Sequence, residues 1–302
     1  MSFADFDNRF RDLPYRGFAF EGGGVAGLAH IGVIKYLDRI GLYYKLSHLS
    51  GSSAGAMMAG LVGCRIPPVK AQEIMLKMNF HDFEDNSYFL VRDIYHFMKT
   101  FGWNWGQAMT EIYNNIIKSY TGVDRITLKQ IKERYGTTLI ITATSVTTRS
   151  TVYYTSDSHP DMVLADAVRR SGGFPYLYPP IKDGKLYLID GGLLNNYPIR
   201  KLYDYLPKDQ VIGSKLYSEE ELECENPFPD DVADYTKTIV EMLHRQNLKV
   251  HVKEEDWLRT IKVNVGKVTA TSFDLTMKEK QDLITAGEEA ARIFFDSLGT
   301  LD

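Results

Sequence analysis

The strongest constraint on the fold is a serine framed by glycines, directly after a short apolar segment. Residues 45–60 read KLSHLSGSSAGAMMAG, which places Ser53 at the centre of a Gly-x-Ser-x-Gly frame between Gly51 and Gly55. A strand that turns sharply into a helix needs glycine two places before and two places after the serine, because a Cβ there would collide with the bend. The frame therefore predicts a strand, a tight turn that presents one hydroxyl, and a helix of small residues at 54–64.

A second glycine cluster lies earlier in the chain. A strand expected at 17–21 leads into a loop of glycines and then into a helix expected at 25–41; the glycines are Gly22, Gly23, Gly24 and Gly27. Unobstructed N–H groups at a helix start suit an anion, either a dinucleotide pyrophosphate or the oxyanion of an acyl-transfer intermediate. A dinucleotide site also needs an acidic residue near the end of the next strand, and the strand at 45–50 has none. Acyl transfer is therefore favoured, with a purely structural turn as the alternative.

A third turn carries a carboxylate. Asp190 ends the apolar strand expected at 185–190 and is followed by Gly191 and Gly192. An aspartate before glycines is most often an ordinary turn residue. We expect this strand to be parallel to the others, however, so that Asp190 lies on the same sheet edge as the two glycine turns, where open α/β sheets bind ligands. Together the three turns supply a nucleophile, an oxyanion site and a base, the minimum set for acyl transfer.

The remaining segments predict an α/β fold with a largely parallel sheet flanked by helices. Further strands are expected at 137–146, 150–156, 210–217 and 259–266, and further helices at about 161–171, 232–250 and 277–297. Thr276 and Glu279 have the capping-box spacing that starts the last helix. The chain is interpreted as one domain over 1–302, with a helical, aromatic-rich cap or insertion at about 68–134.

Composition narrows the function classes. The chain has 302 residues, 44% hydrophobic and 25% charged, with a formal net charge of −4, so no general attraction to nucleic acid is expected. No apolar run approaches the roughly 20 residues that span a bilayer, and the amino terminus lacks the apolar core of a secretory signal. Cys64 and Cys224 are too few for a disulfide framework or a zinc site alone. These features favour a cytoplasmic protein with unpaired thiols and no metal.

Three motifs, GGGVAG, GSSAG and DGG, occur in an order that resembles the patatin-like phospholipase family, and the match covers nearly the whole chain. The spacing of Ser171 and Pro175 and the run DGGLLNNYPI also resemble that family. The resemblance implies a three-layer α/β hydrolase of lipid acyl esters, of phospholipase A or lysophospholipase type. Its substrate would be a phospholipid or another acyl-ester lipid, and it would need no cofactor.

The resemblance also implies roles for individual residues. Ser53 matches the nucleophile, Asp190 the base that receives its proton, and the segment Gly22–Gly24 the oxyanion hole. Many members have Lys or Arg just before the last glycine of the first motif, where this chain has Ala26. Less positive charge is therefore expected near the oxyanion. An acyltransferase, or a catalytically idle scaffold, on the same fold is the alternative to a hydrolase.

A histidine-dependent mechanism is the weaker catalytic alternative. Histidine is the base in a Ser-His-Asp triad, and the chain has seven histidines. We expect His30, His48 and His159 to be packed or surface residues. A triad in the chain order serine, aspartate, histidine would need His244 or His251, which fall within or at the end of a predicted helix.

An aromatic-rich stretch at 83–105 contains Trp103 and Trp105. It is interpreted first as a pair of helices that pack their aromatic side chains into the core. The alternatives are a cap over an acyl-binding groove and a surface that enters a lipid interface, which would make the protein peripheral on membranes. Weak binding to lipid vesicles is expected without another factor, and the need for a protein activator is left open by the sequence.

Overall fold

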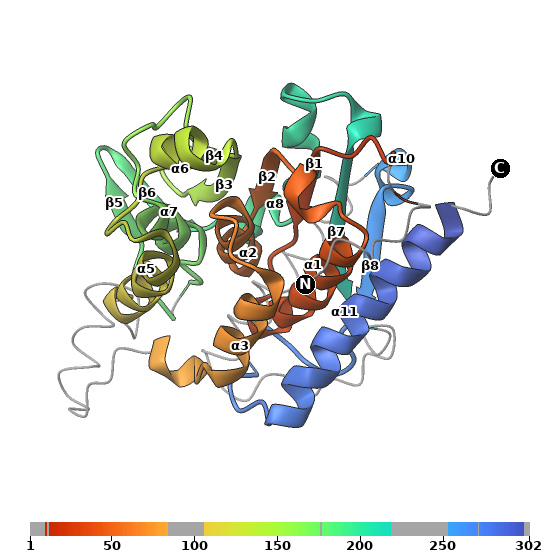
Figure 1. Cartoon of the computed structure of the whole chain (residues 1–302). Helices are drawn as coiled ribbons and strands as arrows, with labels where there is room; N and C mark the ends of the chain where they lie inside the picture. The colour runs from red at the N-terminus through yellow and green to blue at the C-terminus, as the bar shows by residue number, and fades with distance from the viewer. Residues whose placement is uncertain are drawn as a thin grey trace.

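The computed structural model describes residues 10, 12–83, 106–175, 177–218, 253–270 and 272–298. Eight strands in this part of the chain form one sheet with the order β5-β6-β3-β2-β1-β7-β8, and β4 pairs with β3 beside this path (Figure 1). The strands are β1 Gly17–Phe20, β2 His48–Gly51, β3 Thr138–Ser145, β4 Ser150–Thr155, β5 Ile181–Asp183, β6 Leu186–Asp190, β7 Val211–Tyr217 and β8 Thr260–Asn264.

Helices flank the sheet. The α-helices are α1 Ala29–Arg39, α2 Ala54–Gly63, α3 Pro68–Lys77, α5 Gln107–Thr121, α6 Leu128–Tyr135, α7 Leu164–Ser171, α8 Gly192–Asn195, α10 Glu254–Trp257 and α11 Met277–Leu298. Short 3-10 helices are η3 Gly24–Leu28, η4 Tyr43–Lys45, η5 Phe80–Phe83, η6 Pro198–Asp204 and η7 Lys208–Gln210. Within the described residues, no helix is both long and apolar enough to cross a membrane.

The expected α/β fold with a largely parallel sheet is confirmed. Strands β3, β2, β1, β7 and β8 run parallel as consecutive neighbours. The other side of the sheet differs, because β4 and β6 both pair with β3 in antiparallel orientation and β5 pairs antiparallel with β6. The expectation that the strand before Asp190 is parallel was therefore wrong, and β5 was not predicted.

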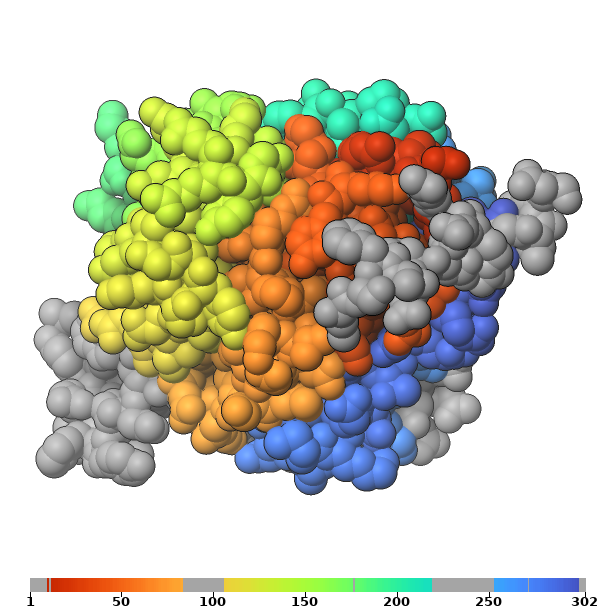
Figure 2. All heavy atoms as spheres, viewed as in Figure 1, coloured from red at the N-terminus to blue at the C-terminus, as the bar shows by residue number. Residues whose placement is uncertain are grey.

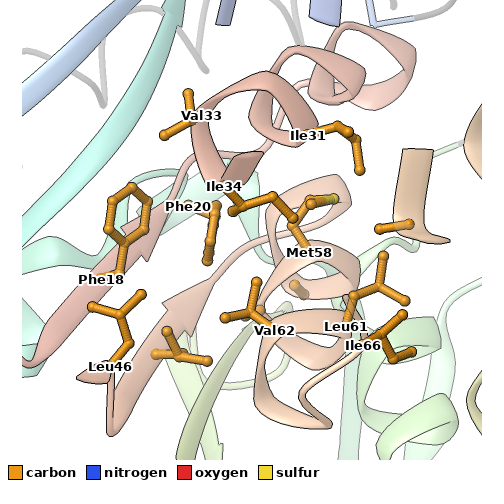
Figure 3. Packing of buried hydrophobic residues seen from close by; sticks show 14 of the residues in the cluster. Phe18, Phe20, Ile31, Val33, Ile34, Leu46, Met58, Leu61, Val62 and Ile66 are labelled. Carbon is orange, nitrogen blue, oxygen red and sulfur yellow. The ribbon is translucent and has the colours of Figure 1, made fainter. Parts of the chain in front are cut away.

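Side chains on β1 alternate between the two faces of the sheet, as the two-residue period of a strand requires. Phe18 and Phe20 belong to the large core cluster, which includes side chains of α1 and α2 (Figure 3). Ala19, between them, belongs to a second cluster on the opposite face, with Ile199 and Leu202 of η6. The sheet is thus covered on both faces, which accounts for a strand without polar positions.

The helices of the large-cluster face lie side by side across the molecule. Residues of α3, drawn in orange, lie between those of α5 in yellow and α11 in blue (Figure 2). Pro68 begins α3 at a position where a missing N–H is tolerated. A capping box of Thr127 and Gln130 starts α6. Helices α3, α5 and α6 overlap the range of about 68–134 that was expected to form a cap or insertion.

Three other expectations concern helices. The helix expected at 25–41 begins as the 3-10 helix η3 and continues as α1. Thr276 and Glu279 form the predicted capping box, since the Thr276 N–H donates to Glu279 Oε2 at 2.8 Å and the Glu279 N–H donates to Thr276 Oγ1 at 3.2 Å. The helix expected at 232–250 lies outside the described residues, as do Cys224, Trp103 and Trp105.

Candidate active site

Ser53 occupies a strained turn between β2 and α2. Its backbone has φ 50° and ψ −121°, a combination that costs a non-glycine residue about 1–3 kcal/mol. A Cβ on Gly51 would overlap the Gly55 carbonyl, and a Cβ on Gly55 would overlap the Phe20 carbonyl. The glycine frame read from the sequence is therefore a steric requirement of this turn.

The sheet register brings Asp190 to the same level as Ser53. Gly51 of β2 lies opposite Ile141 of β3, whereas Asp190 of β6 lies opposite Ala143, two residues further along β3. Ser53 is likewise two residues beyond Gly51. The Ser53 hydroxyl donates a hydrogen bond to Asp190 Oδ2 at 2.9 Å. β3 continues past the end of β2 and pairs there with the last residue of the antiparallel β6. Asp190 therefore lies next to the serine turn.

Asp190 is a buried carboxylate, with 5% of its surface exposed. Burial raises the pKa of Asp190 to about 6, although hydrogen bonds from the Gly192 N–H and the Ser53 hydroxyl, together with the charge of Arg169, act to lower it. The Gly192 N–H donates to Asp190 Oδ1 at 2.7 Å. Both carboxylate oxygens therefore have a donor, and the raised pKa makes the group a stronger base than an exposed aspartate.

The three glycines proposed for the oxyanion hole differ in what their N–H groups do. The Gly22 N–H donates to the Asn196 carbonyl at 3.0 Å. Three other N–H groups have no protein acceptor among the described residues: those of Gly23, Gly24 and Ala54, the first residue of α2. Gly24 and Ala54 also line the cavity beside Ser53. Ala54 was not predicted from the sequence, although the residue after a nucleophile often contributes such an amide.

Asn196 and a buried ion pair hold the glycine loop in place. The Asn196 side chain donates to the Gly22 carbonyl at 2.9 Å. Glu21, just before the loop, accepts from Lys215 Nζ at 2.7 Å and from the Leu216 N–H at 2.6 Å. Burial raises the pKa of Glu21, and the neighbouring Lys215 charge acts against that rise. The sequence did not point to this pair, because its two residues are 194 positions apart.

An apolar cavity opens beside the Ser53–Asp190 pair. It holds about 1060 Å³ of space, part of it open to solvent. Its walls come from α2, α3, η5, α5 and the segment after α7, and they include Met57, Ile74, Phe80, Met109 and Phe174. A cavity with these walls fits a hydrocarbon chain, with the reacting hydroxyl at its polar end.

The three histidines that were expected to be packed or surface residues have their hydrogen bonds elsewhere. His30 is fully buried between the Glu21 carbonyl and the Ser214 hydroxyl, and burial lowers its pKa to about 4. His48 and His159 each contact a neighbouring serine. His244 and His251 lie outside the described residues. The part of the chain that the structure describes also holds no group of three or more His, Cys, Asp or Glu side chains arranged around a metal position.

Fold and site together match a known class of protein, three-layer α/β proteins with a strand–serine–helix turn at the edge of the sheet. A model of the patatin-like phospholipase family matches residues 18–203, more than half of the chain. The chain belongs to this family, and the family resemblance seen in the sequence is confirmed.

The chain is also similar to individual proteins. An uncharacterized protein, R571 of Acanthamoeba polyphaga mimivirus, is 24% identical over 94% of this chain and 95% of its own length. A probable lipid hydrolase, 463L of Invertebrate iridescent virus 6, is 35% identical over 74 residues, 24% of this chain and 26% of its own. The structure of VipD from Legionella pneumophila superposes with a TM-score of 0.65 and 19% identity, over 94% of this chain and 67% of VipD. The last comparison shows a shared fold.

The family and the lipid hydrolase relative support lipid acyl hydrolase activity for this chain. Members of the family act on lipid substrates. An apolar cavity beside a hydroxyl–carboxylate pair is compatible with such a substrate.

Proposed function

We propose that the chain hydrolyses carboxylic esters of phospholipids through an acyl-enzyme on Ser53, with Asp190 as the base. The observation that carries this proposal is the 2.9 Å hydrogen bond from the Ser53 hydroxyl to Asp190 at the edge of an apolar cavity. Serine is a poor nucleophile until a base removes its proton, and Asp190 already accepts that proton's hydrogen bond. Burial supports the role, because a carboxylate with a raised pKa holds the proton better during attack.

In the first half-reaction, Ser53 Oγ attacks the ester carbonyl and its proton moves to Asp190. Charge develops on the carbonyl oxygen, and the N–H groups of Gly24 and Ala54 are the donors that line the cavity there, with Gly23 next to them. Each donor in such a site is worth about 3–4 kcal/mol in the transition state. The dipole of α2 adds positive potential at the same place. Asp190 then gives its proton to the leaving alcohol, and Ser53 carries the acyl group.

In the second half-reaction, water replaces the leaving alcohol. Asp190 takes a proton from the water, whose oxygen attacks the acyl carbonyl. Asp190 then returns this proton to Ser53 Oγ as the bond between Oγ and the acyl carbon breaks, which releases the fatty acid and free Ser53. The acyl chain would lie between α2, α3 and α5, whose Met57, Ile74 and Met109 side chains line the cavity. We propose that the helices within 68–134 act as a cap over the bound acyl chain, and that the protein is a single hydrolase domain.

The dyad is tested by Ser53→Ala and Asp190→Asn. Each variant should release no fatty acid from labelled phospholipid vesicles above background, while keeping the melting behaviour of a folded protein. Mass spectrometry of the lysolipid and fatty-acid products reports the ester position that is cleaved, and equal amounts of the two products indicate transfer to water. Turnover in a folded Asp190→Asn protein would reject Asp190 as the base and favour a histidine-dependent mechanism.

A further inference from the structure

The end of α7 contacts both members of the proposed dyad. The Ser171 hydroxyl oxygen accepts a hydrogen bond from the backbone N–H of Ser53 at 2.8 Å. The Ser171 carbonyl accepts from the Gly191 N–H at 3.0 Å, and the Gly173 carbonyl accepts from the Asp190 N–H at 2.9 Å. Two residues, Ser171 and Gly173, therefore hold the backbones of the nucleophile and the base together.

Only one of these three hydrogen bonds depends on a side chain. The bonds to Gly191 and Asp190 use backbone carbonyls, which any residue could supply. The bond to Ser53 needs an acceptor on the side chain of residue 171. Ser171 is fully buried, so water would not readily replace a missing hydroxyl. Ser171 was part of a family-like motif, but no sequence pattern explained why a serine is needed there.

The bond matters because of the conformation that Ser53 adopts. A non-glycine residue stays at φ 50° only where the surrounding structure holds it there. The hydrogen bond from the Ser53 N–H to Ser171 fixes the orientation of the peptide plane that precedes the Ser53 Cα. This orientation and φ determine where Cβ and Oγ point. Since the Oγ must reach Asp190 Oδ2, the direction of the N–H and the direction of the hydroxyl are linked.

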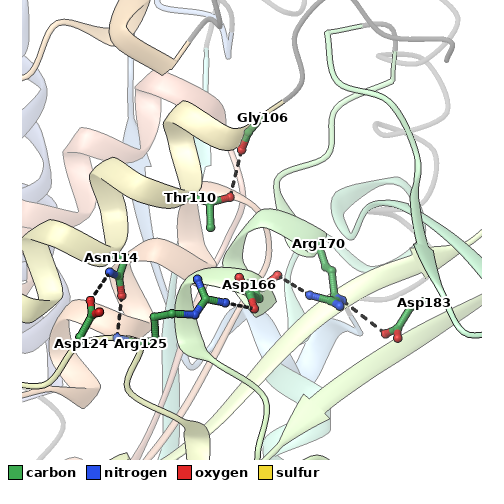
Figure 4. Close-up of polar contacts among 8 residues, drawn as sticks. All are labelled: Gly106, Thr110, Asn114, Asp124, Arg125, Asp166, Arg170 and Asp183. Carbon is green, nitrogen blue, oxygen red and sulfur yellow. Dashed lines mark hydrogen bonds and ion pairs between the residues drawn. The ribbon is translucent and has the colours of Figure 1, made fainter.

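The helix that carries Ser171 is itself held on two sides (Figure 4). Arg125, before α6, donates to Asp166 Oδ2 of α7 at 2.7 Å. Arg170 of α7 donates from Nε to Asp183 Oδ2 of β5 at 3.3 Å and from Nη1 to the Asp166 carbonyl at 3.2 Å. The buried face of α7 also packs in the large core cluster through Leu164 and Val168. The Ser171 hydroxyl is therefore presented from a fixed helix end.

We propose that Ser171 is a positioning residue for ester hydrolysis: its hydroxyl oxygen holds the Ser53 turn in the conformation that directs Oγ at Asp190. This inference rests on the proposed function, because it assigns a part in that reaction. Ser171 acts through Ser53 and is too deeply buried to touch substrate. Its replacement should misplace the nucleophile and leave the cavity walls unchanged.

Ser171→Ala is the direct test. We expect kcat to fall about 10- to 100-fold, as for a nucleophile displaced by a fraction of an ångström to 1 Å, with KM within about twofold. Labelling of Ser53 by a fluorophosphonate should slow in parallel, which reports nucleophile reactivity without a lipid substrate. The acidic limb of the kcat/KM profile should move to higher pH, because the Ser53 hydrogen bond lowers the pKa of Asp190. The charge of Arg169, which acts in the same direction, is unchanged in this variant.

Ser145→Ala is the matched control. Ser145 is also fully buried, and its hydroxyl oxygen also accepts a backbone N–H, that of Thr148, at 3.1 Å. Both variants lose the same kind of hydrogen bond, so both should melt at lower temperature. Only Ser171→Ala should change kcat, the labelling rate and the pH profile. If Ser171→Ala does not fold, Ser171→Cys, whose sulfur is a weak acceptor, takes its place.

The outcomes separate this inference from the proposed function. If the wild-type protein releases fatty acid but Ser171→Ala matches Ser145→Ala in kcat, labelling and pH profile, the positioning role is overturned and the hydrolase remains. If the wild-type protein releases none and Ser53 does not react with the fluorophosphonate, the proposed function fails and the positioning role fails with it.

Discussion

Strands β1 and β2 end level with each other, since Phe20 lies opposite Gly51, and each is followed by its own glycine turn. β6 approaches from the other direction. It pairs with β3 through three residues, Leu188, Ile189 and Asp190, and its other neighbour, β5, is also short. The parallel part of the sheet therefore builds the nucleophile and the glycine loop locally, whereas the antiparallel part supplies the carboxylate through long-range pairing.

This difference teaches where each half of the site is sensitive to change. In the parallel part, close packing of backbone on backbone determines the turn geometry, so a substitution there causes a steric clash. In the antiparallel part, the position of Asp190 follows from the length of β3 and from contacts with the end of α7. A substitution there displaces the Asp190 carboxylate or changes its charge. The predictions below use this contrast.

The largest effect is expected from Gly55→Ala in the parallel part. The added Cβ would overlap the carbonyl oxygen of Phe20 and lie 2.6 Å from that of Glu21, and backbone cannot move aside cheaply. We expect a loss of about 4 kcal/mol in the free energy of unfolding. Urea denaturation followed by circular dichroism measures it.

The matched change in the antiparallel part is Gly184→Ala, in the turn between β5 and β6. Gly184 has φ +60°, but a Cβ there would meet no atom within 4 Å. Its cost is therefore one of conformation alone, about 1 kcal/mol. Equal losses in the two variants would contradict the view that steric constraint is concentrated at the serine turn.

The same contrast explains how much could be predicted from the sequence. Ser53, Gly51 and Gly55 lie within five residues, so their spacing predicts a turn whose geometry the structure shows. Asp190 was singled out correctly as a neighbour of Ser53, but for a wrong reason, because its strand is antiparallel. The expectation succeeded because β3 continues past the end of β2 and pairs with Asp190 at Ala143, two residues beyond the partner of Gly51. No pattern in the sequence gives that register.

Residues that support the site were harder to find from the sequence. The Glu21–Lys215 ion pair, the Asn196 contact with Gly22 and the Ser171 contact with Ser53 all join distant segments. Periodicity and turn chemistry describe neighbours along the chain, so they carry no information about such pairs. Ser171 and Asn196 were noted only within family-like motifs, without a physical role.

The next largest effect concerns the charge on Asp190. Its pKa is about 6 in the folded protein, compared with 3.8 for an unperturbed aspartate. The folded state therefore holds this proton more tightly than the unfolded state. The resulting stabilisation is fully present below about pH 4 and is lost as pH rises through 6. A shift of about two pKa units corresponds to about 3 kcal/mol of unfolding free energy.

Asp190→Asn removes this titration. Its melting temperature should exceed that of the wild-type protein by a margin that grows between pH 4 and pH 7, as measured by calorimetry. In the wild-type protein, kcat/KM should rise with pH around a midpoint near 6, because only the ionised carboxylate can accept the serine proton. A margin independent of pH would show that the carboxylate is not held in a desolvated site.

The smallest effect is expected at Ser52, next to the proposed nucleophile. Ser52 is fully buried, and its hydroxyl has no hydrogen-bond partner within the described part of the chain. Burying an unpaired hydroxyl is unfavourable, so Ser52→Ala should leave the free energy of unfolding unchanged or raise it by up to about 1 kcal/mol. Fatty-acid release should stay within about twofold of wild type, whereas Ser53→Ala should abolish it. If Ser52→Ala instead destabilises the protein by more than 1 kcal/mol, the Ser52 hydroxyl makes a bond, for example to a buried water, that supports the turn.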